Sequence, residues 1–125
     1  MKNPRKSLIK RLDEAFATEV KKRARKEFDG KCPFCGIRDI EHCFHFVTRA
    51  KYKIRWDFRN ATGSCAACNY QNEFDPAPFM LWYTRKYGLA EFEKLVKDGN
   101  GISKFSNSDL EEMLKEIRGM NADSK

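Results

Sequence analysis

The sequence has only two histidines and four prolines, and it lacks any long apolar run. Its apolar stretches are only a few residues long, which is too short for a membrane-spanning helix. Charged residues fill the first positions, where a secretion signal would carry an apolar core, so the sequence predicts a cytoplasmic protein. A chain of 125 residues has room for one domain with a modest core and is too short for two ordinary ones.

The positive charge of the chain is unevenly spread. The net charge is +7, but residues 1–70 carry 17 Lys and Arg against 8 Asp and Glu, whereas residues 71–125 carry 8 against 10. A basic first part with a slightly acidic remainder favours a polyanionic partner such as DNA on one face of the protein. A solvated basic helix, which would include Lys21 to Lys26, is an equally good explanation from charge alone.

Four of the five cysteines form two C-x-x-C pairs, "CPFC" at Cys32 and Cys35 and "CAAC" at Cys65 and Cys68. Four thiolates with this spacing predict a closed tetrahedral zinc site with a structural role. Redox cysteines are the alternative, but a thioredoxin-like pair needs a βαβ pattern that the sequence does not show. The fifth cysteine, Cys43, is expected to be a small buried hydrophobic residue.

Apolar periodicity predicts a single domain, residues 1–125, that begins with a basic amphipathic helix at 5–28. Short aromatic and β-branched stretches predict strands at about 42–48 and near 60–65, on either side of a basic loop. Further helices are expected after Cys65 and, in the C-terminal part, at 77–87, 89–98 and 106–119. Ser106 and Ser108 are candidate N-caps of the last helix, and residues 120–125 are expected to form a frayed tail.

Several separate motifs occur in order between the cysteine pairs and just beyond them. They are "FHFVTR", "IRWDFRN", "CAACN", "DPAPF" and "RKYG". In this order they resemble the HNH, or His-Me finger, endonucleases, and most closely the NinG (Rap) recombination nucleases of phage lambda. The resemblance covers about residues 30–88. It implies an α+β fold in which a zinc-stapled ββα-metal core, placed here at 30–76, is flanked by helices.

The same resemblance implies a role for three residues. His45 would be the general base, Asn60 would orient it, and Asn69 would bind a catalytic Mg²⁺ or Mn²⁺. These residue types suit phosphodiester hydrolysis, because a neutral imidazole accepts a proton near pH 6.5 and an amide oxygen is a ligand for a hard cation. A lone histidine between aromatic residues is more often a core residue, but the flanking cysteine pairs and Asn69 favour a base. His42 is expected on the other face of the strand, at the surface.

The sequence departs from the family pattern at several positions. Phe44 stands where many related nucleases have a second metal ligand, and Thr62 stands where NinG-like proteins often have a histidine. Asp75 and Glu41 are candidates to complete a catalytic cation site, since a carboxylate binds Mg²⁺ better than an amide does. Glu73 is a weaker candidate.

The loop between the two strands is rich in Lys and Arg, with aromatic residues between them. Its basic residues are expected to neutralise DNA phosphates, and they are Arg49, Lys51, Lys53, Arg55 and Arg59. Tyr52 and Trp56 could stack on unpaired bases. Alternatively, Trp56 and Phe58 pack the loop onto the core.

The resemblance implies a substrate of branched recombination DNA, such as D-loops or four-way (Holliday) junctions, for a phage or prophage protein in a bacterial host. Two other functions stay open. One is a catalytically inactive, zinc-stabilised module that binds branched or single-stranded DNA. The other is an interaction protein that uses the acidic helix at 106–119, and the helices at 89–119 could also form a homodimer contact.

Overall fold

The computed structural model describes residues 3–123, beginning with the long helix α1, Pro4–Glu27. Asn3 caps this helix, because its side chain accepts hydrogen bonds from the backbone N–H groups of Arg5 and Lys6. Pro4 occupies the first turn, where a helix residue needs no N–H partner, so its missing N–H costs nothing. The predicted basic helix is therefore confirmed. Its buried face includes the apolar residues Leu8, Leu12, Phe16, Val20 and Ala24.

Two short strands, β1 (His42–His45) and β2 (Ala61–Ser64), form an antiparallel pair. In this register His45 lies opposite Ala61, and Phe44 lies opposite Thr62. Successive side chains of a strand point to opposite faces, so Cys43 and His45 share one face and Phe44 lies on the other. The first strand is shorter than the predicted 42–48, because the chain turns away from the sheet after His45.

The segment between the strands was expected to be a loop, but part of it is helical. One turn of α-helix, α2 (Tyr52–Arg55), is followed by a single 3₁₀ turn, η1 (Phe58–Asn60), which leads directly into β2. Asp57 caps that turn by accepting the backbone N–H of Arg59. These turns place Ile54 and Asn60 in the interior.

The C-terminal part follows the predicted order of helices. After α3 (Ala66–Gln71), helices α4 (Ala77–Tyr87) and α5 (Leu89–Gly99) are separated by Gly88, whose φ of 99° suits a residue without Cβ. Helix α6 spans Asn107–Ala122, and Ser106 and Asp109 form a capping box at its start. The prediction of a frayed tail from residue 120 is wrong up to Ala122, and residues 124–125 lie outside the described residues.

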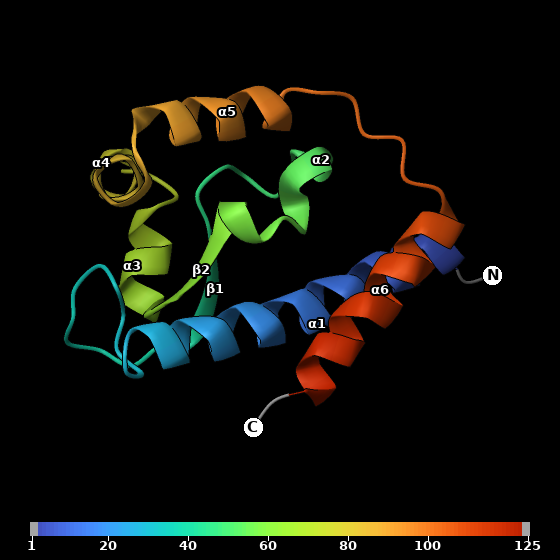
Figure 1. The fold of residues 1–125 in the computed structure, drawn as a ribbon, viewed down its shortest axis with the longest axis horizontal. Coiled ribbons are helices and arrows are strands. Elements are labelled where there is room, and N and C mark those ends of the chain that lie inside the picture. The colour runs from blue at the N-terminus through green and yellow to red at the C-terminus, as the bar shows by residue number, and fades with distance from the viewer. Residues whose placement is uncertain (1–2, 124–125) are drawn as a thin grey trace.

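Figure 1 shows the arrangement of these elements, with α6 crossing α1 on one side of the molecule. The strands lie between α1 and α5, and α4 is seen end-on beside them. One group of buried side chains joins α1 to α6 and includes Trp56, and a second joins Ile54 of α2 to Tyr83, Phe92 and Leu95. None of the described helices has an apolar stretch long enough to cross a membrane.

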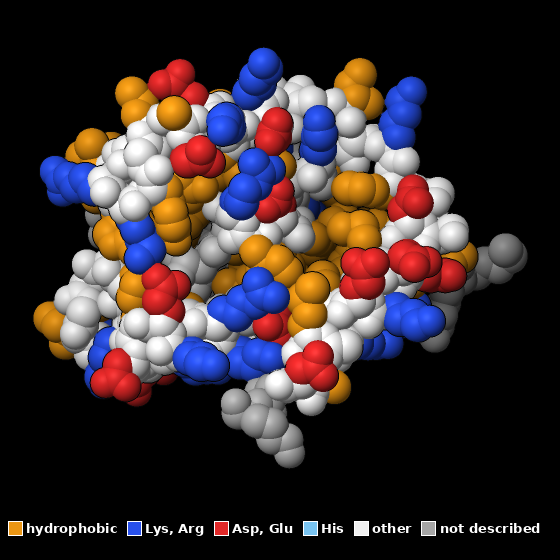
Figure 2. All heavy atoms as spheres, in the orientation of Figure 1, with side chains coloured by type: hydrophobic (Ala, Val, Ile, Leu, Met, Phe, Trp, Pro, Cys, Tyr) orange, Lys and Arg blue, Asp and Glu red, His pale blue; other side chains and the backbone are white. Residues whose placement is uncertain are grey.

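Charged residues of both signs are mixed on the face of the molecule shown in Figure 2. In α1, the exposed Arg23 and the partly exposed Lys22 form ion pairs with the buried carboxylate of Glu19, at 2.8 and 2.9 Å. The predicted basic patch of α1 is therefore partly neutralised within the helix itself.

Strand β2 lies very close to α1 at Gly63. A Cβ atom at this position would be 2.5 Å from Cγ2 of Ile40 and 2.9 Å from Cβ of Ala24. Real Cβ atoms do not approach other carbons this closely, so any side chain here would force the helix and the strand apart. The glycine thus sets the distance between α1 and the sheet.

This close packing predicts opposite effects for two glycine substitutions. We expect Gly63→Ala to lower the free energy of unfolding by about 1–3 kcal/mol through overpacking. Gly119→Ala, on α6 where no atom lies within 4 Å of the added Cβ, should raise it by about 0.5–1 kcal/mol. Urea unfolding of both variants measures the difference, and a stabilising Gly63→Ala would contradict the packing.

Candidate metal centre and catalytic cleft

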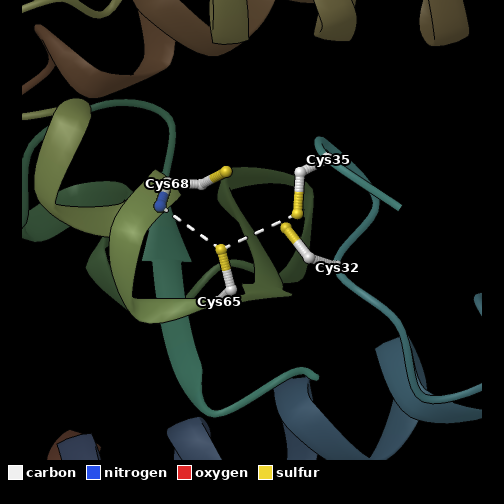
Figure 3. A group of neighbouring side chains, drawn as sticks. All are labelled: Cys32, Cys35, Cys65 and Cys68. Atoms are coloured by element: carbon white, nitrogen blue, oxygen red, sulfur yellow. Dashed lines mark hydrogen bonds between the residues drawn. The ribbon is translucent and has the colours of Figure 1, made fainter. Parts of the chain in front are cut away.

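The four paired cysteines converge on one point, where they could hold a zinc ion (Figure 3). Cys32 and Cys35 come from the turn that follows α1, and Cys65 and Cys68 come from the junction of β2 and α3. Their sulfur atoms all lie within 4.8 Å of one another, and those of Cys35 and Cys65 are 3.9 Å apart. A tetrahedral site with zinc–sulfur bonds of about 2.3 Å needs sulfurs roughly 3.8 Å apart, so the cluster fits zinc.

Backbone N–H groups around the cluster favour thiolates. Hydrogen bonds from the backbone of Arg38 and Ile37 lower the pKa of Cys35 to about 6. Burial raises the pKa of Cys32, and burial together with the neighbouring sulfurs raises the pKa of Cys68. Without a cation, Cys32, Cys35 and Cys68 would therefore not ionise together, and zinc binding would release protons from the cluster.

A cleft of about 780 Å³ lies between α1 and α3 and runs along β1. Helix α1 contributes Asp13, Phe16 and Ala17 to its wall, and β1 contributes Cys43 and His45. The polar side chains of Asn69, Asn72 and Glu73 line it on the α3 side. The cleft therefore brings together the candidate base and two of the candidate cation ligands, Asn69 and Glu73.

His45 is held by a hydrogen bond between its Nε2 atom and the backbone carbonyl oxygen of Arg55, at 3.0 Å. A carbonyl oxygen can only accept, so Nε2 carries the proton and Nδ1 of the neutral ring keeps its lone pair. Burial, aided by the charges of Arg49 and Arg55, lowers the pKa of His45. The imidazole is thus neutral at pH 7 and has one free acceptor atom.

Asn60 is completely buried and makes three hydrogen bonds to the backbone. Its Oδ1 atom accepts from the N–H of Val47 at 2.7 Å, and its Nδ2 atom donates to the carbonyls of Val47 and Ile54, at 2.9 and 3.3 Å. None of these three hydrogen bonds involves the imidazole. The Asn60 side chain ties the segment just after His45 to α2, the helix whose last carbonyl holds the ring.

The structure places some of the candidate cation ligands at the cleft and others away from it. Asn69 lines the cleft, and so does Glu73, which was the weakest candidate from the sequence. Glu41 and Asp75 are exposed and do not line it, and Asp75 lies 3.4 Å from the amide of Gln71.

Asn72 makes a contact with His45 that the sequence analysis did not predict. Its Nδ2 atom donates to the backbone carbonyl of His45 at 3.0 Å, which fixes α3 against β1. The available signal was helical spacing, because positions three and four residues after Asn69 fall on the same face of a helix. That rule selects Asn72 and Glu73 together.

Phe44 and Thr62, at positions where the nucleases that the motifs resemble often carry ligands, are both buried and lie opposite each other on the sheet. Alternation along the strand directs both of them to the face opposite His45. The Phe44 ring packs against Phe34 and Phe79, with centroids 4.7 and 5.0 Å away. These two positions therefore serve the core and not the cleft.

The predicted DNA-binding residues differ in how exposed their side chains are and in whether a carboxylate pairs with them. Trp56 is buried and its indole N–H donates to Asp13, so the prediction that it stacks on bases is wrong and the packing alternative is correct. Arg55 is also paired with Asp13, and Arg59 is paired with Asp57 and Asp98. The exposed candidates are Arg49, Lys51, Tyr52, Lys53 and Arg59.

Two further exposed aromatic rings, Tyr70 and Phe74, belong to residues that follow cleft-lining residues in the sequence. Tyr70 and Phe74 are each 66% exposed, and their ring centroids are 5.3 Å apart. They are next in sequence to Asn69 and Glu73, which line the cleft. Sequence reasoning passed over them. Tyr70 lies in α3 and Phe74 lies in the turn that follows it, and neighbouring exposed aromatic residues are an ordinary sign of a contact surface.

His42 and Cys43 complete the description of β1. His42 is exposed, as predicted, and it also borders the cleft. Cys43 is half-buried, and burial raises the pKa of its thiol to about 12, so it stays protonated near pH 7.

Comparison of this chain with models of known protein families, with curated proteins and with solved structures finds no match. The family resemblance therefore rests on the sequence motifs alone.

The cysteine geometry predicts a single tightly held zinc ion. Structural zinc contributes about 10–16 kcal/mol of binding free energy in small zinc domains, as much as the whole stability of a small domain. We therefore expect a strong chelator or Cys65→Ser to remove the metal and unfold the core. Zinc content by atomic emission and far-UV circular dichroism measure both effects.

Cys43→Ala is the matched control, because it removes a cysteine outside the cluster. This variant should keep its full zinc content. A wild-type protein purified without zinc and still folded would contradict the site.

Proposed function

We propose that this protein is a metal-dependent DNA endonuclease of the HNH type. One observation carries the proposal. His45 lines a cleft between α1 and α3, its Nε2 atom is bound to a backbone carbonyl, and its Nδ1 atom is left as a free acceptor. A neutral imidazole fixed in one tautomer beside polar oxygen donors is what a general base for water needs.

His45 would take a proton from the attacking water at Nδ1. Because the ring is held through Nε2, the direction of its free lone pair is fixed relative to α2. A divalent cation, when bound, supplies a positive charge for the phosphate and for the leaving oxygen. Asn69 and Glu73 would hold it with one amide oxygen and one carboxylate.

This ligand set suits Mg²⁺ or Mn²⁺. Among residues 3–123, the four cysteines form the only group of three or more His, Cys, Asp or Glu side chains close enough to share an ion. Mg²⁺ is commonly held by one or two carboxylates, with waters and the substrate phosphate completing the octahedron. The cleft therefore fits a cation that binds together with the DNA.

DNA as the substrate is supported by the charge and the aromatic residues near the cleft. Arg49, Lys51 and Lys53 are exposed and lie between β1 and the end of α2, where they could contact phosphates. Tyr70 and Phe74 could stack on unpaired bases, as at a branch or a flap. Branched recombination DNA is also the substrate class that the resemblance to NinG nucleases implies.

A DNA-binding module without catalysis is the second candidate. The observation that favours it is the small number of carboxylates in the cleft, since only Asp13 and Glu73 line it and Asp13 is engaged by Arg55. Such a protein would bind the same DNA through the same basic residues. It would not cleave that DNA with any cation.

We expect His45→Ala to lower the cleavage rate of labelled four-way and linear DNA by about 10²–10⁴-fold, because the general base is lost. DNA binding should be unchanged. His42→Ala is the matched control at the edge of the cleft and should cleave normally. Assays with Mg²⁺, Mn²⁺ and EDTA test the cation requirement at the same time.

The pH profile gives a second signature of the same base. Burial lowers the pKa of His45, so the active neutral form persists below the ordinary value of 6.5 and cleavage should fall only at still lower pH. Cleavage that survives His45→Ala would contradict the mechanism. Tight binding without cleavage under any cation would favour the binding module.

The availability of the basic side chains predicts how DNA binding depends on salt. Arg49→Ala and Lys51→Ala should each reduce the slope of log K against log [salt] by about 0.9, the value for one lost phosphate contact with duplex DNA. Lys115→Ala, an exposed cation on α6, is the control and should leave the slope unchanged. Fluorescence anisotropy titrations over a range of salt concentrations measure the slopes, and equal slopes for all variants would contradict this interface.

A further inference from the structure

Asp13, on α1, contacts a segment of the chain more than 40 positions away in the sequence. Its Oδ1 atom accepts from Nε of Arg55 at 3.0 Å and from the indole N–H of Trp56 at 2.9 Å, and its Oδ2 atom accepts from Nη2 of Arg55 at 2.6 Å. Burial by itself raises the pKa of Asp13, but these hydrogen bonds outweigh it and hold the pKa below its usual range. The carboxylate is therefore ionised and fully occupied with donors from the end of α2.

The same Arg55 also holds the candidate base. Its side chain binds Asp13, while its backbone carbonyl accepts the hydrogen bond from Nε2 of His45. Arg55 is the last residue of α2, and the carbonyl groups at the end of a helix have no partner within the helix. One residue thus connects a carboxylate on α1 to the imidazole on β1.

Helix α2 needs anchors of this kind to keep its place. A helix of four residues does not persist by its own hydrogen bonds, so its position is set by tertiary contacts. Ile54 is buried, and its carbonyl accepts from the Asn60 amide. The bidentate pair of Asp13 and Arg55 is the contact that joins α2 to α1.

The surroundings of Arg55 agree with an internal role. Its side chain is only 12% exposed, and its guanidinium group lies over the rings of Tyr52 and Trp56, at 4.8 and 5.6 Å. A guanidinium enclosed in this way, with Nε and Nη2 on a carboxylate and Nη1 on the backbone carbonyl of Arg49, is not free to bind a phosphate. The earlier assignment of Arg55 to DNA binding therefore gives way to a structural contact.

We propose that Asp13 is a positioning residue for His45, acting through the Arg55 side chain to fix the carbonyl that orients the imidazole. The inference rests on the proposed function, because it assigns Asp13 to the same cleft. It goes beyond the family resemblance, which begins near residue 30 and does not include α1. Asp13 itself acts through Arg55 and has no contact with the reacting atoms in this scheme.

The test uses Asp13→Asn, which keeps the shape and an oxygen for Trp56 but removes the charge that holds Arg55. The direct readout is the imidazole ¹⁵N NMR spectrum of His45, recorded in the full-length protein. In wild type we expect the single tautomer with the proton on Nε2, and in Asp13→Asn a mixture of both tautomers. Asp39→Asn, which removes an exposed carboxylate paired with Lys31, is the matched control and should keep the wild-type spectrum.

Catalysis provides the second readout. Asp13→Asn should lower kcat by about 10- to 100-fold, as expected for a misplaced catalytic group, and leave KM and DNA affinity unchanged. Arg55→Lys, which keeps a cation but loses the bidentate geometry, should reproduce both effects, and the double variant should be no worse than either single one. Arg55→Lys also carries the test if Asp13→Asn does not fold, which circular dichroism and zinc content reveal.

The two proposals fail in different ways. An unchanged His45 tautomer in folded Asp13→Asn or Arg55→Lys would overturn the positioning role, whatever the activity. A wild-type protein that cleaves no DNA, but whose His45 tautomer responds to Asp13→Asn, would overturn the endonuclease and leave the positioning contact in place.

Discussion

Two strands of four residues each do not form a stable sheet by themselves, and one of them carries His45. Three sets of contacts hold the two strands in place. Helix α1 packs against the sheet at the distance that Gly63 allows, the ring of Phe44 is buried among Phe34 and Phe79, and the cysteine cluster joins the turn after α1 to the start of α3. A metal ion at that cluster would close a loop around both strands, which reduces the freedom of the unfolded chain.

Several polar side chains in and behind the cleft form hydrogen bonds with the backbone. Asn60 bonds to Val47 and Ile54, Asn72 bonds to the carbonyl of His45, and the imidazole bonds to the carbonyl of Arg55. Buried polar groups are costly without partners and directional when they have them. The position of the candidate base is therefore set by backbone atoms, whose places depend on the fold as a whole.

Most of the helices could be predicted from the sequence, because apolar periodicity and terminal residues are local signals. The pattern Ser106 to Asp109 marks a helix start, and Gly88 marks a boundary, without knowledge of the tertiary structure. The cysteine cluster was equally predictable, since two C-x-x-C pairs constrain four ligands at once. Short strands and single turns such as α2 depend on distant contacts, so their boundaries were not accessible in this way.

The parts of the cleft that escaped prediction all involve partners far apart in the chain. Nothing near Trp56 shows that its indole would meet Asp13, and alternating basic and aromatic residues are typical of both DNA-binding loops and packed segments. Glu73 could have been preferred over Asp75 and Glu41, because it lies one helical turn after Asn69. From the sequence alone, Phe44 suggested that the cleft lacks a metal ligand. The structure shows that the side chain is buried in the core, so this position does not line the cleft.

Several of the positively charged side chains in the sequence are paired with carboxylates, so fewer are free to contact DNA than the number of Lys and Arg residues suggests. Arg55 is paired with Asp13, Arg59 with Asp57 and Asp98, and on α1 Lys22 and Arg23 are paired with Glu19. Arg49 differs from these, since its side chain is 61% exposed and its ion pair with Asp13, at 4.0 Å, is long. An ion pair that is long and open to water contributes little, so Arg49 can turn to a phosphate at small cost. The internal pairs hold the cleft in shape, and the cations left at its rim are the ones available to guide a polyanion into it.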